Sequence, residues 1–257
     1  MMLVHTETRE TFLWELAELE EHVSSRCLLS HSPKNPSRVV LVVNPSMPVL
    51  WYCRPGSARW FRHTYEDDAD TGSPYSSLMG GMSWLVVMGG KFYTLRSSDD
   101  GHLVVSLEFS PGPKFAVLAK TNNEQGEGEA GWFSHVFGLL LESDGELFLV
   151  CRYYLMEPRR MPCKINVYKL DLSERAEMVK VSTLGERSFF MDNWSTDGVS
   201  MQAKQVGLKE NYIYFIDFGD KGLYVHDLGR GTTALYDHVP DLEDGIGITP
   251  KLVVTPW

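Results

Sequence analysis

Two hydrophobic patterns divide the chain near residue 37. Over residues 7–23 the apolar residues return every three or four positions, and most of the remaining positions are acidic. These apolar residues are Phe12, Leu13, Leu16, Leu19 and Val23. The spacing predicts one N-terminal amphipathic helix that packs on the rest of the protein, with a helix that docks on a partner as the alternative. A polar, Pro-containing linker follows at Ser30–Ser37.

From residue 38 onward the hydrophobic runs are short and are separated by turn residues. We expect strands at Val39–Val43, Val49–Cys53, Trp60–Tyr65, Trp84–Val87, Lys91–Leu95, Leu103–Phe109, Phe115–Ala119, Phe137–Leu141, Leu147–Tyr153, Ile165–Leu170, Met178–Ser182, Ser188–Met191, Val199–Gln202, Tyr212–Ile216, Leu223–Leu228 and Thr233–Tyr236. Asp-Gly and Gly-rich steps between them, such as Ser143-Asp144-Gly145, supply the positive φ that tight hairpins need. Strands joined by hairpins are antiparallel, which excludes a doubly wound parallel sheet.

The predicted strands recur in similar groups. An apolar strand, a loop and an alternating strand appear at 91–108, again at 146–171 and again at 212–228. A unit of about 50–65 residues with four short strands is typical of propeller blades, although a β-sandwich gives similar local patterns. We therefore predict an all-β protein: a partial or small β-propeller of antiparallel four-stranded blades. Residues 1–37 would form the helix and linker, and 38–257 about three to four blades, with an incomplete one at 38–68.

Composition and charge narrow the possible partners. The chain has 257 residues, a net charge of −10 and a pI near 5.3. An acidic protein is repelled by nucleic acid and by anionic membranes, so neither is expected as the main ligand. The apolar runs are shorter than the ~20 residues that span a bilayer, and the acidic N-terminus does not resemble a signal peptide. We expect the protein in the cytoplasm, the nucleus or both.

The cysteines do not form a recognisable site. They lie far apart without a C-x-x-C pair, at Cys27, Cys53, Cys151 and Cys163. This spacing predicts neither a disulfide framework nor a zinc site. Cys53 and Cys151 lie inside apolar strands, where we expect them to be buried.

The motifs that resemble catalytic or ligand-binding signatures lack the residues or the spacing that those functions require. Gly126–Gly131 matches G-x-G-x-x-G but carries two carboxylates where a phosphate would sit. Asp217-Phe218-Gly219 has none of the other kinase motifs beside it, and the acidic run Glu66–Asp70 lacks calcium-loop spacing. The eight histidines are scattered without ligand spacing. We therefore expect no catalytic, cofactor or metal-binding residues, and a protein that is not an enzyme.

Six segments in order resemble a known family. They are Trp51–Trp60 (WYCRPGSARW), Gly90–Leu95 (GKFYTL), Leu141–Arg152 (LESDGELFLVCR), Val167–Asp171 (VYKLD), Leu184–Phe190 (LGERSFF) and Lys209–Phe215 (KENYIYF). Together they resemble the plant F-box-associated, KIB-type β-propeller domain, from about residue 38 to the C-terminus. Residues 1–37 do not resemble an F-box, so a Skp-type adaptor is not an expected partner.

The resemblance implies a protein-interaction module. Propellers that follow F-boxes present substrates to ubiquitin ligases, and the partner here would be an unidentified protein. Loop aromatics and a charged residue are the candidate partner-binding residues: Trp60, Arg62, Trp132 and Trp194. Trp60 and Trp194 have burial in the core as their alternative role.

Two other functions remain open. The first is a small-molecule or glycan-binding or hydrolysing propeller, which would require convergent carboxylates or a metal. The second is a truncated product without an independent function, because an incomplete set of blades exposes an unpaired strand edge.

Overall fold

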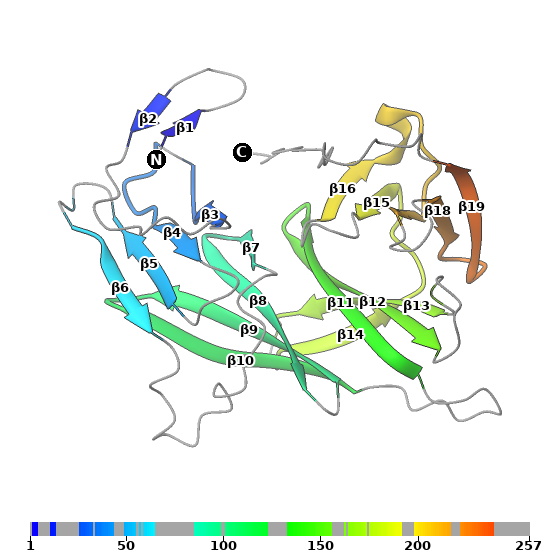
Figure 1. Ribbon diagram of the computed structural model, residues 1–257, viewed down its shortest axis with the longest axis horizontal. Helices are drawn as coiled ribbons and strands as arrows, with labels where there is room; N and C mark the ends of the chain where they lie inside the picture. The colour runs from blue at the N-terminus through cyan, green and yellow to red at the C-terminus, as the bar shows by residue number, and fades with distance from the viewer. Residues whose placement is uncertain are drawn as a thin grey trace. The chain divides into compact units, whose positions relative to one another are not determined.

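Strands make up almost all of the regular structure in the computed structural model (Figure 1). It describes residues 2–4, 11–13, 26–32, 34–43, 49–54, 57, 59–64, 85–98, 101–122, 133–155, 162, 164–173, 175–191, 198–216 and 222–238. The chain forms two compact units, residues 1–82 and 83–257.

The first unit contains one strand pair and one four-stranded antiparallel sheet. Its strands are β1 (Met2–Val4), β2 (Thr11–Leu13), β3 (Arg26–Leu29), β4 (Val40–Val43), β5 (Val49–Cys53) and β6 (Phe61–Thr64). Strands β3 to β6 follow one another in sequence order, and β4 is apolar at every position because it is buried along its whole length. Strand β3 precedes the predicted boundary at residue 38, yet it pairs with β4 across that boundary.

The predicted N-terminal helix is wrong where the structure describes it. Thr11–Leu13 forms strand β2, which pairs antiparallel with β1 through the partners Met2 and Leu13. Thr and Phe favour strands, and pairing with β1 satisfies the backbone groups that a helix would have satisfied internally. The other residues of the predicted helix lie outside the described residues.

The second unit begins with two antiparallel four-stranded sheets in sequence order. Sheet I contains β7 (Leu85–Met88), β8 (Lys91–Ser98), β9 (Gly101–Phe109) and β10 (Pro113–Asn122). Sheet II contains β11 (Phe133–Ser143), β12 (Glu146–Leu155), β13 (Lys164–Asp171) and β14 (Glu177–Val181). The β11–β12 hairpin turns at Asp144 and Gly145, whose φ values of 51° and 75° match the predicted turn.

Sheet III departs from the predicted four antiparallel strands. It contains β15 (Arg187–Met191), β16 (Gly198–Gln202), β17 (Tyr212–Ile216), β18 (Gly222–Asp227) and β19 (Thr232–His238), in the order β16-β15-β17-β18-β19. Strand β15 runs parallel to β17. The short 3-10 helix η3 (Ala203–Val206) and Gly207, at φ 74°, follow β16 and reverse the chain. Asn211 then donates to the carbonyl of Arg187 at 2.8 Å, so β17 begins beside β15.

Sheet II is buried on both of its faces. Strand β12 shows why, because its alternate side chains enter two different cores. Leu147, Leu149 and Cys151 pack with residues of sheet I. Phe148 and Val150 pack with residues of sheet III such as Phe189 and Phe215. This two-sided burial explains why β12 is an almost continuous apolar run, and it confirms the predicted burial of Cys151.

Candidate functional site

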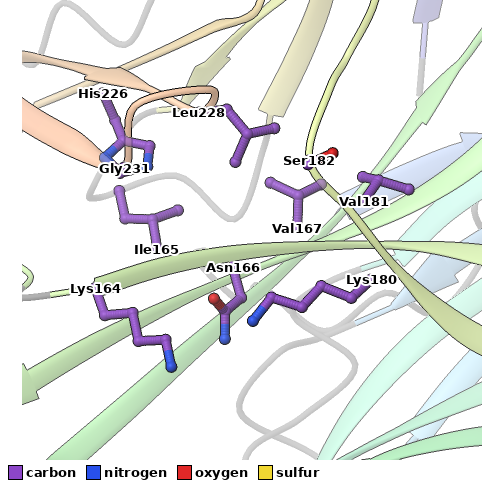
Figure 2. A pocket seen from close by; sticks show the side chains of 10 residues that line it. All are labelled: Lys164, Ile165, Asn166, Val167, Lys180, Val181, Ser182, His226, Leu228 and Gly231. Carbon is purple, nitrogen blue, oxygen red and sulfur yellow. The ribbon is translucent and has the colours of Figure 1, made fainter.

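A cleft of about 480 Å³ lies between sheets II and III (Figure 2). Three segments form it: the first half of β13, the end of β14 and the turn from β18 to β19. The described residues that line it are Lys164, Ile165, Asn166, Val167, Lys180, Val181, Ser182, His226, Leu228 and Gly231.

The alternation of β13 gives the cleft one apolar wall. Ile165 and Val167 point toward the β18–β19 turn, where Leu228 faces them, while Lys164 and Asn166 point to the opposite side of the strand (Figure 2). Ile165 and Val167 are buried in the core shared by sheets II and III, and Leu228 packs on its edge. The wall formed by Ile165, Val167 and Leu228 is therefore aliphatic, and polar residues on the other side of β13 and on β14 complete the lining.

The polar side of β13 has its own partners. Asn166 is buried and donates from Nδ2 to the hydroxyl of Tyr168 at 3.4 Å. The Nζ atom of Lys164 lies 5.7 Å from the ring centroid of Tyr153, a cation–π contact. Burial raises the pKa of the Tyr153 hydroxyl, so it stays protonated. These contacts hold β13 in place without using the cleft.

His226 brings a buried polar group to the apolar wall. Its side chain is only 3% exposed, and Figure 2 shows its ring directed toward Ile165. The Nδ1 atom lies 2.9 Å from the hydroxyl oxygen of Thr233 on β19. Among the described residues, the Nε2 atom has no hydrogen-bond partner. Burial lowers the pKa of His226, against the opposing effect of Asp227, so the imidazole is neutral near pH 7.

The turn after β18 is held by a carboxylate. Asp227 accepts hydrogen bonds from the backbone of Arg230 at 3.0 Å and from the hydroxyl of Tyr212 at 2.9 Å. Gly231 has a φ of 66°, a conformation that favours glycine, and its N–H donates to the carbonyl of Asp227 at 2.8 Å. Because these bonds define the turn, Leu228 and Gly231 are preorganised at the edge of the cleft.

A polar contact joins sheets II and III at the other end of strands β12 and β13. The guanidinium of Arg187 donates to the carboxylate of Glu146 at 2.9 Å and to the hydroxyl of Ser143 at 3.1 Å. Its Nε donates to the carbonyl of Leu184 at 3.0 Å, and its carbon Cζ lies 5.0 Å from the ring centroid of Phe148. Hydrogen bonding from Lys169, and then from Arg187, lowers the pKa of Glu146 despite partial burial. We call these residues the Arg187 clamp.

The predicted partner-binding residues do not belong to this cleft. Trp60 is half-buried just before β6, and Arg62 is exposed on β6; both lie in the first unit. Trp132 and Trp194 lie outside the described residues. A role of these four residues in partner binding stays a prediction. Sequence analysis missed the cleft residues because strand alternation does not show which strands of different sheets face each other.

The described residues show no arrangement of metal ligands. No group of three or more His, Cys, Asp or Glu side chains among them has the geometry to hold a metal ion. The cleft lining contains no carboxylate among the residues that the structure describes. Over the same described part of the chain, no helix has the length and apolar character needed to cross a bilayer.

Comparison with known proteins identifies the family. The model of the KIB1-4 beta-propeller family matches residues 1–237. The chain belongs to this family. The match includes residues 1–37, which the resemblance of individual motifs did not reach. No curated protein and no solved structure matches the chain.

In this KIB1-4 beta-propeller chain, three of the family-like segments contact one another. Arg187 of Leu184–Phe190 binds Glu146 of Leu141–Arg152. Asn211 of Lys209–Phe215 accepts the backbone N–H of Leu184 at 2.7 Å. These motifs therefore encode contacts within and between sheets II and III, whereas His226, Val181 and Leu228 of the cleft lie outside all of them.

Proposed function

We propose that the protein is an interaction module that binds a segment of a partner protein in the cleft between sheets II and III. The observation that carries this proposal is the cleft itself, an open space of about 480 Å³ between two sheets whose described lining includes Ile165, Val181 and Leu228. The propeller family supports the proposal because the fold presents rigid surfaces to partners.

A non-catalytic role is part of this proposal. Glycoside hydrolysis uses two carboxyl groups about 5–10 Å apart, and none of the ten described lining residues supplies one. The neutral His226 has only a threonine hydroxyl on its other nitrogen, without a carboxylate to orient it as a catalytic base.

A small molecule is the second candidate ligand. The volume of about 480 Å³ lies within the range of about 300–1,000 Å³ typical of small-molecule sites. The cleft is open on the side of β14, where Lys180 and Ser182 are exposed, which favours an extended chain over an enclosed ligand.

The resemblance to F-box-associated domains extends the proposal to ubiquitination. If the partner is a substrate of a ubiquitin ligase, the cleft would hold it while the ligase modifies it. Such a partner would be a protein of the cytoplasm or nucleus.

Site-specific photo-crosslinking tests the proposal. Benzoylphenylalanine replaces Ser182, which lines the cleft, or Ser173, which is equally exposed but lies in the turn before β14. Each full-length protein is irradiated in a plant cell extract, the source that the resemblance implies. We expect a discrete crosslinked protein at position 182 and not at position 173, because only the first position reaches the cleft.

The captured protein is then purified and its affinity measured by calorimetry. The variant Val181→Lys places a charge in the cleft, and Val179→Lys places the same charge two residues earlier on β14, where Val179 is 42% exposed and does not line the cleft. We expect at least tenfold weaker binding for Val181→Lys and little change for Val179→Lys, because one charge against an aliphatic wall costs about 1.4 kcal/mol or more. Identical crosslinks at positions 182 and 173, or equal losses in both variants, would overturn the proposal.

A further inference from the structure

The outer edge of β14 offers a way for a partner segment to enter the cleft. Among the described residues β14 pairs with β13 alone, at the end of the order β11-β12-β13-β14. We propose that the partner adds an extended strand to this edge, and that the strand alternates apolar and acidic side chains. This inference rests on the proposed function and adds the binding mode and the chemistry of the partner.

The edge of β14 is accessible where it borders the cleft. Lys180 and Ser182 are exposed, Val181 is half-buried, and all three line the cleft. Sheet I packs on one face of β14 through Met178, which joins the core that contains Ala119 of β10. Because this contact uses a face of the strand, a further strand can still reach the backbone N–H and C=O groups along the edge.

The two faces of β14 differ in chemistry. Val181 lies on the side of Leu228 and packs on the core between sheets II and III. Lys180, one residue earlier, points to the opposite face (Figure 2). Residues directly opposite each other on neighbouring strands share a face. A strand added to β14 therefore needs an apolar side chain beside Val181 and a side chain that suits an ammonium group beside Lys180.

The charge of the cleft lining favours a carboxylate beside Lys180. Lys164 lies on the same side of β13 as the ammonium group of Lys180 (Figure 2), and the described lining contains no carboxylate. The whole chain has a net charge of −10, so this cationic lining is a local exception. At the far end of β14, Glu177 lies opposite Asp171, which places the acidic residue of the partner at the cleft end.

Fluorescence polarisation with labelled peptides and the whole 257-residue chain tests the inference. The first peptide alternates, Gly-Ser-Glu-Val-Glu-Val-Glu-Ser-Gly. The second has the same composition in the order Gly-Ser-Glu-Glu-Glu-Val-Val-Ser-Gly. We expect the alternating peptide to bind saturably and the second to bind about tenfold more weakly, because only alternation places the two kinds of side chain on different faces.

Two charge reversals locate the binding site. Lys180→Glu places like charges opposite each other and should weaken binding of the alternating peptide about tenfold. Lys114→Glu is the matched control, because it makes the same charge change at an exposed lysine of β10, the edge strand of sheet I, outside the cleft. Equal losses in both variants, or equal binding of the two peptides, would show attraction by net charge alone and would overturn the proposal.

Backbone pairing is tested by N-methylation of the alternating peptide. In an extended strand the N–H groups of the valines point to one edge and those of the glutamates to the other. One peptide is N-methylated at both valines and another at all three glutamates. Pairing with β14 predicts that one of them binds and the other does not. The same result for both, whether binding or loss, would exclude the addition of a strand at this edge.

The two proposals fail separately. A crosslinked protein at position 182 combined with no preference for the alternating peptide would remove this binding mode and keep the protein partner. Binding of the alternating peptide that depends on Lys180, without any crosslinked protein, would remove the partner in the extract and keep the strand-binding edge.

Discussion

The interface between sheets I and II and the interface between sheets II and III are built by different chemistry. Between sheets I and II the strands approach closely over Gly138 of β11. A Cβ atom at this position would lie 2.5 Å from Cδ2 of Leu95 and 3.1 Å from Nε2 of His102. The interface is therefore tightly packed around Gly138.

The interface between sheets II and III has a packed core, a polar clamp and a cleft. The Arg187 clamp ties sheet III to the β11–β12 hairpin of sheet II. Ser143 and Ser200 add a hydroxyl–hydroxyl contact of 2.7 Å, and Gln202 donates to Asp144 at 3.1 Å. At the other end of β12 and β13 the sheets separate at the cleft.

The difference shows how interfaces between similar sheets can be packed in different ways. The Arg187 clamp holds sheets II and III together at one end of their interface, so the sheets can separate at the other end. Each interface also buries a neutral histidine, His102 in the first and His226 in the second. His226 lines the cleft, whereas His102 lies against Gly138 in the other interface.

The largest effect on stability is expected from breaking the Arg187 clamp. Arg187→Met keeps the length of the side chain but leaves Ser143, Glu146 and the carbonyl of Leu184 without their hydrogen bonds from Arg187. The loss should be about 3 kcal/mol in the free energy of unfolding, because the Arg187 side chain is only 19% exposed. Urea denaturation followed by far-UV circular dichroism measures it.

Arg230→Met is the matched control for the clamp. Its side chain is 81% exposed and its Nε lies 3.7 Å from the carboxylate of Asp227, so the loss should stay below about 0.5 kcal/mol. Similar losses in both variants would show that the clamp does not hold sheets II and III together.

The next largest effect is a loss of stability at low pH, which depends on His102. Burial lowers the pKa of His102 from 6.5 to about 4. Between pH 4 and pH 6.5 the imidazole of His102 is protonated in the unfolded chain but not in the folded protein. The contribution of His102 to the free energy of unfolding is therefore complete above pH 6.5 and is lost as the pH falls toward 4. Its full size is about 3 kcal/mol at most.

His102→Gln removes the titrating ring and keeps a polar side chain. The free energy of unfolding is measured in urea at pH 7 and at pH 4 for both proteins. We expect a smaller drop between the two pH values in His102→Gln than in the wild type. An identical drop would mean that the pKa of His102 does not differ between the folded protein and the unfolded chain.

The smallest effect is expected from adding a methyl group at Gly138, where sheets I and II approach closely. Gly138→Ala introduces a methyl group against Leu95 and His102, which should cost about 2 kcal/mol of unfolding free energy through overpacking. Gly185→Ala is the control, because a Cβ there meets open space and only its φ of 66° opposes the change, at about 1 kcal/mol. The thermal midpoints of the two variants give the order, and a larger shift for Gly185→Ala would contradict the tight packing of sheets I and II.

Local sequence predicted most of the strands. All strands from β4 to β19 lie where alternation and turn residues placed them, within a few residues at each end. The prediction failed at β2, where apolar residues at helical spacing form a strand with β1, and it missed β3. Short segments such as Thr11–Leu13 depend on a pairing partner, and periodicity within one segment does not contain that information.

The candidate site was predicted least well. Trp60 and Arg62 were chosen for their residue types, and the cleft residues were not chosen at all. His226 was one of eight scattered histidines in the sequence. Its position in the cleft depends on the fold: the ring lies opposite Ile165, which is far away in the sequence, and contacts Thr233 on the neighbouring strand.

The amino-acid sequence by itself determined the all-β class, the hairpins and the membership of the KIB1-4 beta-propeller family. These depend on alternation and turn chemistry, which act over a few residues, and on the order of motifs along the chain. Only the tertiary structure decided that β15 lies parallel to β17, that Arg187 clamps sheet III to sheet II, and that a cleft lies between these sheets. Each of these features brings together segments that are distant in the sequence. The packing of whole sheets sets the distance between such segments, and a local sequence pattern does not specify it.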